Sequence, residues 1–158
     1  LWLGEETGAT YTTDLTVIET NLDDMTGELL GYVQERLFEL GARDAWFTPI
    51  QMKKNRPATM LSAIVPSELE SQAIALLMKE TSTLGIRVRP LSRFEADRES
   101  LEVDTSVGRA GVKVKRLDGR NVAVSPEYEA CRAIALERGM PLQEVYRIVQ
   151  REAEQKLL

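Results

Sequence analysis

Residues 45–65 read AWFTPIQMKKNRPATMLSAIV, two apolar stretches joined by the charged segment KKNRP. The stretches are rich in β-branched and aromatic residues, which is typical of strands, whereas KKNRP is polar and typical of a turn. The segment therefore predicts a β-hairpin. Pro49 favours an edge position for the first strand, because proline cannot donate to a ladder of backbone hydrogen bonds.

Helical patterns flank this hairpin on both sides. Before it, leucine and valine recur at helical spacing over residues 29–40, and Gly41 follows as a plausible helix end. After it, Ser67 and Glu70 have the spacing of a capping box, and an apolar stripe follows them. We therefore expect one helix before the hairpin and one after it.

A further strand is expected outside each helix. Residues 15–21 (LTVIETN) and residues 86–93 (IRVRPLSR) are rich in β-branched side chains. The order β-α-β-β-α-β predicts an α+β fold with a ferredoxin-like core over residues 15–100. Residues 1–14 lack periodicity and are expected to be a linker from an amino-terminal domain.

Residues 101–158 are predicted to add a β-hairpin and carboxy-terminal helices to this core. The alternating stretches LEVDTSVG and GVKVKRL indicate strands, and the pair Asp118-Gly119 suits a two-residue turn. We expect the next helix to begin with Ser125 as its N-cap residue. The last helix is predicted over residues 140–155.

Composition excludes several classes of protein. The chain of 158 residues has a net charge of −5, which argues against a non-specific nucleic-acid binder, since that would need a broad basic face. No apolar run approaches the roughly 20 residues needed to cross a membrane. Histidine is absent and Cys131 is the only cysteine, which fits a cytoplasmic protein and leaves oxygen ligands, and hence Mg²⁺ or Mn²⁺, for any bound metal.

The segment KKNRP concentrates positive charge in an acidic protein. Lys53, Lys54 and Arg56 lie within four residues, with Asn55 shaping the turn. Lysine ammonium groups and an arginine fork suit the binding of a small polyphosphate. The alternative is a solvated hairpin whose charges only keep a sheet edge soluble.

Topology predicts neighbours for this segment. In a ferredoxin-like fold, the loops NLDDMTGE (residues 21–28) and ETSTLG (residues 80–85) emerge at the same end of the sheet as KKNRP. Asp23 and Asp24 are then candidate metal ligands opposite a cationic hairpin, the arrangement of a metal-bridged nucleotide phosphate. The alternative is that these acids, with Thr26, only cap the following helix.

The candidate site has three groups of residues. The candidate catalytic residues are Asp23, Asp24, Lys53 and Lys54, and the candidate metal ligands are Asp23 and Asp24. The candidate nucleotide-binding residues are Lys53, Lys54, Asn55, Arg56, Thr81, Ser82, Thr83 and Arg87.

Four segments of this chain resemble the carboxy-terminal region of the LarC family: ETNLDDMTGE, ARDAWFTPIQMKKNRP, KETSTLGIR and SPEYEACR. The resemblance extends over residues 15–150. It implies a CTP-dependent nickel insertase, or cyclometallase, that hydrolyses CTP with Mg²⁺ or Mn²⁺ and places Ni²⁺ into pyridinium-3,5-bisthiocarboxylic acid mononucleotide. The product is the nickel-pincer cofactor of lactate racemase. The resemblance also implies an amino-terminal domain as a partner, since the family protein is larger.

Two further points stay open in the sequence. With no histidine and one cysteine, the nickel ligands are expected from the thiocarboxylates of the substrate or from the amino-terminal domain. The alternative function is a non-catalytic ferredoxin-like regulatory or oligomerisation module that binds a small anion. A homo-oligomer is expected, because Pro49 on an edge strand and the apolar pair Trp2-Leu3 suggest covered surfaces.

Overall fold

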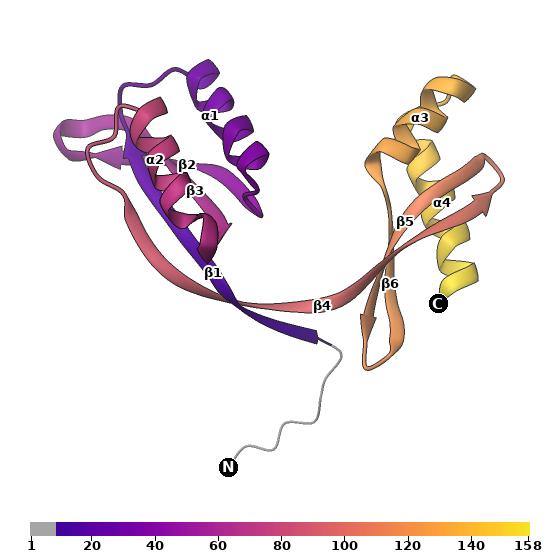
Figure 1. Cartoon of the computed structure of the whole chain (residues 1–158). Coiled ribbons are helices and arrows are strands. Elements are labelled where there is room, and N and C mark those ends of the chain that lie inside the picture. The colour runs from indigo at the N-terminus through magenta and orange to yellow at the C-terminus, as the bar shows by residue number, and fades with distance from the viewer. Residues whose placement is uncertain (1–8) are drawn as a thin grey trace, which may run out of the picture. The chain divides into compact units, whose positions relative to one another are not determined.

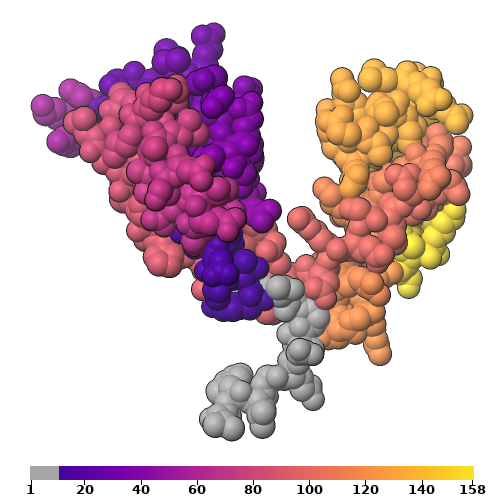
Figure 2. All heavy atoms as spheres, viewed as in Figure 1, coloured from indigo at the N-terminus to yellow at the C-terminus, as the bar shows by residue number. Residues whose placement is uncertain are grey.

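The computed structural model describes residues 9–158, with side chains from Tyr11 onward. The chain forms two compact units, Tyr11–Arg93 and a second that contains Phe94–Leu158. Each unit has its own cluster of buried apolar residues. Figure 2 shows the outer face of each unit with its heavy atoms as spheres.

The first unit has the predicted ferredoxin-like order of elements (Figure 1). The elements are β1 (Ala9–Leu22), α1 (Gly27–Leu40), β2 (Asp44–Met52), β3 (Arg56–Pro66), α2 (Glu70–Glu80) and the start of β4 (Arg87–Thr105). Its strands are ordered β2-β3-β1-β4, and β3 is antiparallel to both of its neighbours. The α+β prediction is confirmed, and β2, which carries Pro49, is an edge strand.

The core of this unit lies between one face of the sheet and the two helices. Alternate strand residues point into it, because side chains on a strand alternate between faces. The helices contribute residues three or four positions apart, which share one helical face. The fully or nearly fully buried members are Ile18, Leu22, Ala45, Leu61, Ala63 and Val65 of the sheet, and Leu30, Val33, Leu37, Ala73 and Leu77 of the helices.

Two strands are longer than predicted. β1 begins at Ala9, within the segment expected to be a linker, and residues 1–8, with the pair Trp2-Leu3, lie outside the described residues. β4 continues to Thr105, where the sequence suggested separate strands. Its charged middle does not break it, because residues 97–105 pair with the next strand and Glu99 forms an ion pair of 3.2 Å across that ladder.

The helix ends show which capping predictions were right. Thr26 caps α1 by accepting a backbone N–H of the first turn, and Gly41, with φ 111°, ends the helix as predicted. The predicted capping box of α2 does not form, because its serine begins a 3₁₀ turn, Ser67–Leu69. The Glu70 carboxylate accepts instead from the Thr16 hydroxyl of β1, at 2.9 Å.

The second unit contains the added hairpin and helices. Its further elements are β5 (Gly108–Leu117), β6 (Arg120–Pro126), α3 (Tyr128–Arg138) and α4 (Leu142–Leu157). The turn between β5 and β6 is the predicted Asp118-Gly119 pair, with φ values of 50° and 73°. The predicted N-cap Ser125 was wrong: it remains paired with Lys113 in the β5–β6 ladder, and α3 begins after Glu127.

The core of the second unit forms where α3 and α4 pack on this hairpin. Val112, Val114, Cys131, Val145 and Val149 are all 0% exposed. Within the described part of the chain, no helix is long and apolar enough to cross a membrane.

Candidate functional site

Three loops meet at one end of the first unit's sheet, as the topology predicted. A guanidinium nitrogen of Arg56, at the start of β3, lies 2.9 Å from a carboxylate oxygen of Asp23, in the loop between β1 and α1. The Ser82 hydroxyl, in the loop between α2 and β4, donates to the neighbouring Asp24. Residues far apart in the sequence therefore share one polar cluster.

The turn between β2 and β3 presents two cations on a strained backbone. Residues Lys53–Asn55 form a short 3₁₀ turn in which Lys54 and Asn55 have φ values of 63° and 58°. Asparagine tolerates this left-handed conformation, whereas a lysine adopts it at a cost of about 1–2 kcal/mol. Both lysines are exposed, and neither forms an ion pair or side-chain hydrogen bond with residues 9–158. Their charges are therefore available to an external anion.

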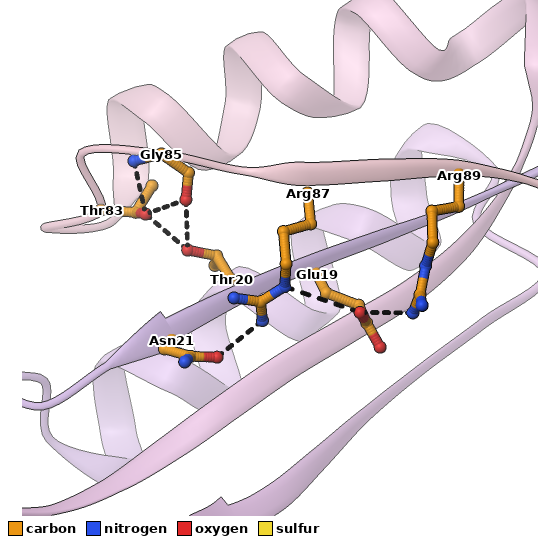
Figure 3. A network of polar contacts seen from close by, with 7 residues as sticks. All are labelled: Glu19, Thr20, Asn21, Thr83, Gly85, Arg87 and Arg89. Atoms are coloured by element: carbon orange, nitrogen blue, oxygen red, sulfur yellow. Dashed lines mark hydrogen bonds and ion pairs between the residues drawn. The ribbon is translucent and has the colours of Figure 1, made fainter. Parts of the chain in front are cut away.

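The loop ETSTLG (residues 80–85), the hydroxyl-rich loop, is fixed to the end of β1 by a buried threonine. The Thr20 hydroxyl is 0% exposed, lies 3.0 Å from the Gly85 carbonyl oxygen and contacts the Thr83 hydroxyl (Figure 3). Thr81 bonds back to the Leu77 carbonyl at 2.6 Å and so ends α2. Thr81 and Thr83 thus hold the loop in place, and Ser82 is the member of the three that reaches the acidic pair.

Sequence reasoning missed Thr20. The signal was present, since Thr20 occupies an inward position of β1 between the buried residues Ile18 and Leu22. A polar residue at such a position needs a hydrogen-bond partner. Only the folded chain shows that the partner is the loop after α2.

Arg87 lies on the opposite face of the sheet from the helices, in a ladder of polar groups (Figure 3). It donates to the Asn21 side chain at 2.7 Å, and its Nε lies 3.7 Å from the Glu19 carboxylate. Arg89 approaches the same carboxylate at 2.6 Å. The structure therefore places Arg87 beside the cluster but bonded to β1, and it reveals Glu19 as a partner that sequence reasoning did not identify.

The acidic pair does not amount to a complete metal site. No group of three or more His, Cys, Asp or Glu residues able to hold a metal occurs among residues 9–158. Asp23 and Asp24 bring two carboxylates, each already engaged by a neighbour, so their metal role stays a prediction. Cys131 is buried in the other unit, and this burial raises the pKa of its thiol, which disfavours the thiolate that binds soft metals.

Comparison with known proteins gives consistent matches along the chain. A family model described as nickel insertion protein matches residues 1–146. A relative from Geobacter metallireducens is 52% identical over 153 residues, which is 97% of this chain and 39% of the relative. The pyridinium-3,5-bisthiocarboxylic acid mononucleotide nickel insertion protein of Thermotoga petrophila is 48% identical over 136 residues, which is 86% of this chain but 34% of that protein.

Solved structures extend the similarity to three dimensions. The apo form of LarC2, described as the C-terminal domain of a cyclometallase involved in the synthesis of the NPN cofactor of lactate racemase, superposes with a TM-score of 0.82 at 38% identity. The match covers 89% of this chain and 95% of that one. A protein of Methanopyrus kandleri superposes with a TM-score of 0.68 at 28% identity, over 93% of this chain and 90% of its own.

Proposed function

This chain belongs to the nickel insertion protein family and corresponds to its carboxy-terminal domain, and from that premise we propose that it binds CTP with Mg²⁺ or Mn²⁺ for a nickel insertase. The insertase hydrolyses CTP and places Ni²⁺ into pyridinium-3,5-bisthiocarboxylic acid mononucleotide, the substrate in the name of the Thermotoga relative. Because the chain spans 39% or less of the relatives reported above, the full reaction belongs to the longer protein. A cytoplasmic location is part of the proposal.

One observation carries the nucleotide part of this proposal. Lys53 and Lys54 carry charges without a partner among the described residues, at the same end of the sheet where Asp23 and Asp24 are held by Arg56 and Ser82. Compact positive charge beside paired carboxylates suits a triphosphate whose oxygens share a divalent cation. The left-handed backbone at Lys54 supports a functional role, since such strain concentrates at ligand-binding sites.

The donor set fits a hard divalent cation bound together with phosphate. Mg²⁺ is usually held by one or two protein carboxylates plus phosphate oxygens and water, so Asp23 and Asp24 suffice as the protein's share. The metal would supply neutralisation of charge on the phosphates. Lys53 and Lys54 bind and orient the same phosphates, and Arg56 holds the Asp23 carboxylate toward them.

Nickel is the cargo of the reaction rather than a resident metal of this domain. The chain has no histidine, and its one thiol, Cys131, is buried. Soft ligands for Ni²⁺ are therefore supplied by the thiocarboxylates of the substrate or by the rest of the longer protein. We expect the isolated chain to bind CTP without completing nickel insertion at the rate of the full-length protein.

Calorimetric titration of the four nucleoside triphosphates, with and without Mn²⁺, tests the nucleotide part. We expect CTP to bind in the presence of Mn²⁺, and the variants Lys53→Ala and Asp24→Asn each to weaken binding about tenfold, the effect of losing one charged contact. Lys79→Ala is the matched control, because Lys79 is an exposed lysine of α2 that lies 3.6 Å from Glu80.

Two results would contradict the proposal. The first is equal CTP affinity with and without Mn²⁺, which would remove the metal from the site. The second is an equal loss of CTP affinity in Lys79→Ala and Lys53→Ala, which would show that the turn contributes only general surface charge and no specific contact.

A further inference from the structure

A row of side chains crosses the sheet of the first unit on the face opposite α1 and α2. Trp46 of β2 is directly paired with Ser62 of β3, and Ser62 is directly paired with Glu19 of β1. Arg87 and Arg89 of β4 then contact Glu19 from the next strand (Figure 3). The row thus brings together an indole, a hydroxyl, a carboxylate and two guanidinium groups.

The arginines of this row are only partly neutralised. The Glu19 carboxylate lies 2.6 Å from Arg89 and 3.7 Å from Arg87, and the Glu19 side chain is 14% exposed. The Arg89 and Arg87 side chains are 64% and 49% exposed, so both are open to solvent beside that carboxylate. One carboxylate against two guanidinium groups, each with five donors, leaves charge and donors for a second anion.

The buried Ser62 hydroxyl is an independent indication that Glu19 changes its hydrogen-bond partner when a ligand binds. Its side chain is 0% exposed, and its hydroxyl has no hydrogen-bond partner within the described part of the chain. Leaving a buried hydroxyl unpaired is costly. Directly paired residues of antiparallel strands have Cβ atoms about 4.5–5.5 Å apart, so a Glu19 carboxylate released from the arginines is within reach of this donor.

Trp46 provides an aromatic surface at the edge strand. It is 36% exposed and lies next to Ser62 in the ladder. An indole face stacks on a flat ring and attracts a cationic one most strongly among the aromatic side chains. From β2 to β4 the row spans three strand intervals, roughly 14 Å, which is the scale of a nucleotide.

We propose that this row binds a planar aromatic anion of the pyridinium carboxylate mononucleotide class, the chemical class of the nickel-accepting substrate. The cationic ring stacks on Trp46, and the phosphate group at the far end of the nucleotide binds Arg89 and Arg87. Glu19 is displaced by that group and accepts a hydrogen bond from Ser62. This inference rests on the proposed function, and it would place the second substrate on the same unit as the nucleotide.

Titration of the whole chain with nicotinic acid mononucleotide, a pyridinium 3-carboxylate nucleotide, tests this site. We expect the probe to bind, and Trp46→Ala and Arg89→Gln each to weaken its binding about tenfold. Ser62→Ala should also weaken the probe while raising the melting temperature, because it removes an unpaired buried hydroxyl. Phe38→Ala and Arg36→Gln, exposed residues of α1, are the matched controls and should change nothing.

The same variants are titrated with CTP and Mn²⁺, which reports folding and separates the two proposals. Weaker probe binding with unchanged CTP binding supports the site. The proposal is overturned if Trp46→Ala and Arg89→Gln bind the probe with the same affinity as the parent chain. It is also overturned if the parent chain binds CTP but does not bind the probe. Probe binding at this row in a chain that does not bind CTP supports the row as a site and contradicts the nucleotide proposal instead.

Discussion

At the scale of the residue, the left-handed backbone of Lys54 lowers the stability of the turn, whereas its charge serves the proposed binding of phosphate. It is the second residue of the cationic turn and has a φ of 63°, which glycine adopts freely and lysine does not. The chain thus carries a charged side chain where a stable hairpin would favour glycine. Such a conflict is expected at a ligand-binding position rather than at a purely structural turn.

Replacing Lys54 by glycine separates these two roles. We expect Lys54→Gly to leave the free energy of unfolding unchanged or to raise it by about 1 kcal/mol, because relief of backbone strain outweighs the added freedom of the unfolded chain. Affinity for CTP with Mn²⁺ should fall about tenfold through loss of one cation. Chemical denaturation and calorimetry measure the two quantities.

Lys54→Ala is the control for that variant. It removes the same charge but keeps a Cβ atom in the left-handed conformation, so it should lose affinity without any gain in stability. A glycine variant that is less stable than the alanine variant would show that the turn conformation is not strained.

At the scale of the element, β1 organises the candidate site through both of its faces. Its inward face carries Thr20, which holds the loop after α2, and its outward face carries Glu19 and Asn21, which hold the arginines of β4. Its end leads directly into Asp23. One strand therefore positions the loop that contains Asp23, the hydroxyl-rich loop, and the arginines Arg87 and Arg89 together.

Replacing Thr20 by valine tests this role of β1. Valine keeps the shape but removes the hydroxyl that bonds to Gly85, so we expect Thr20→Val to lower the free energy of unfolding by about 1–3 kcal/mol. Because the loop that carries Ser82 is loosened, CTP affinity should fall as well. Denaturant unfolding and nucleotide titration give the two readouts.

Thr16, four residues before Thr20 on the same strand, is the matched control. Its side chain is also buried, and its hydroxyl donates to Glu70 at 2.9 Å. Thr16→Val should cost stability without changing CTP affinity. If both variants lowered the CTP affinity equally, the loss would reflect general destabilisation of the unit rather than loss of the hydrogen bond between Thr20 and Gly85.

At the scale of the whole molecule, the described residues form two hydrophobic cores, and the proposed CTP site belongs to the first unit. The proposed CTP-binding residues and the arginine ladder all belong to Tyr11–Arg93. The second unit has its own buried cluster around β5, α3 and α4. A ligand stabilises the unit that binds it, by an amount set by its concentration relative to its dissociation constant.

Hydrogen exchange can localise that stabilisation. We expect CTP with Mn²⁺ to slow exchange within residues 21–26, 53–56 and 81–85, and to leave the helices of the second unit unchanged. Equal protection of α3 and α4 would contradict the assignment of the nucleotide to the first unit.

Core variants give a complementary comparison, since Leu37 and Val149 are both 0% exposed in different cores. Leu37→Ala should cost roughly 2–5 kcal/mol in the first unit, so that the unit that carries the proposed CTP site unfolds more readily. Val149→Ala should destabilise the second unit and leave CTP affinity unchanged.

The sequence alone determined the order of the elements and the chemistry of the loops. The apolar periods around residues 45–65 predict β-α-β-β-α-β, and that order brings three loops to one end of the sheet without any knowledge of contacts. Local signals also predicted Gly41 and the Asp118-Gly119 turn correctly, because left-handed backbone has a strong residue preference.

Only the tertiary structure decided which side chains meet. Ser67 and Ser125 had good local capping signals, yet Ser67 begins a 3₁₀ turn and Ser125 stays in a strand ladder, since long-range pairing outweighs a cap. Strand register decides the pairing of Asp23 with Arg56 and the buried bonds of Thr20, and it leaves the Ser62 hydroxyl without a partner among the described residues. Register joins residues that are distant along the chain, so no short stretch of sequence contains it.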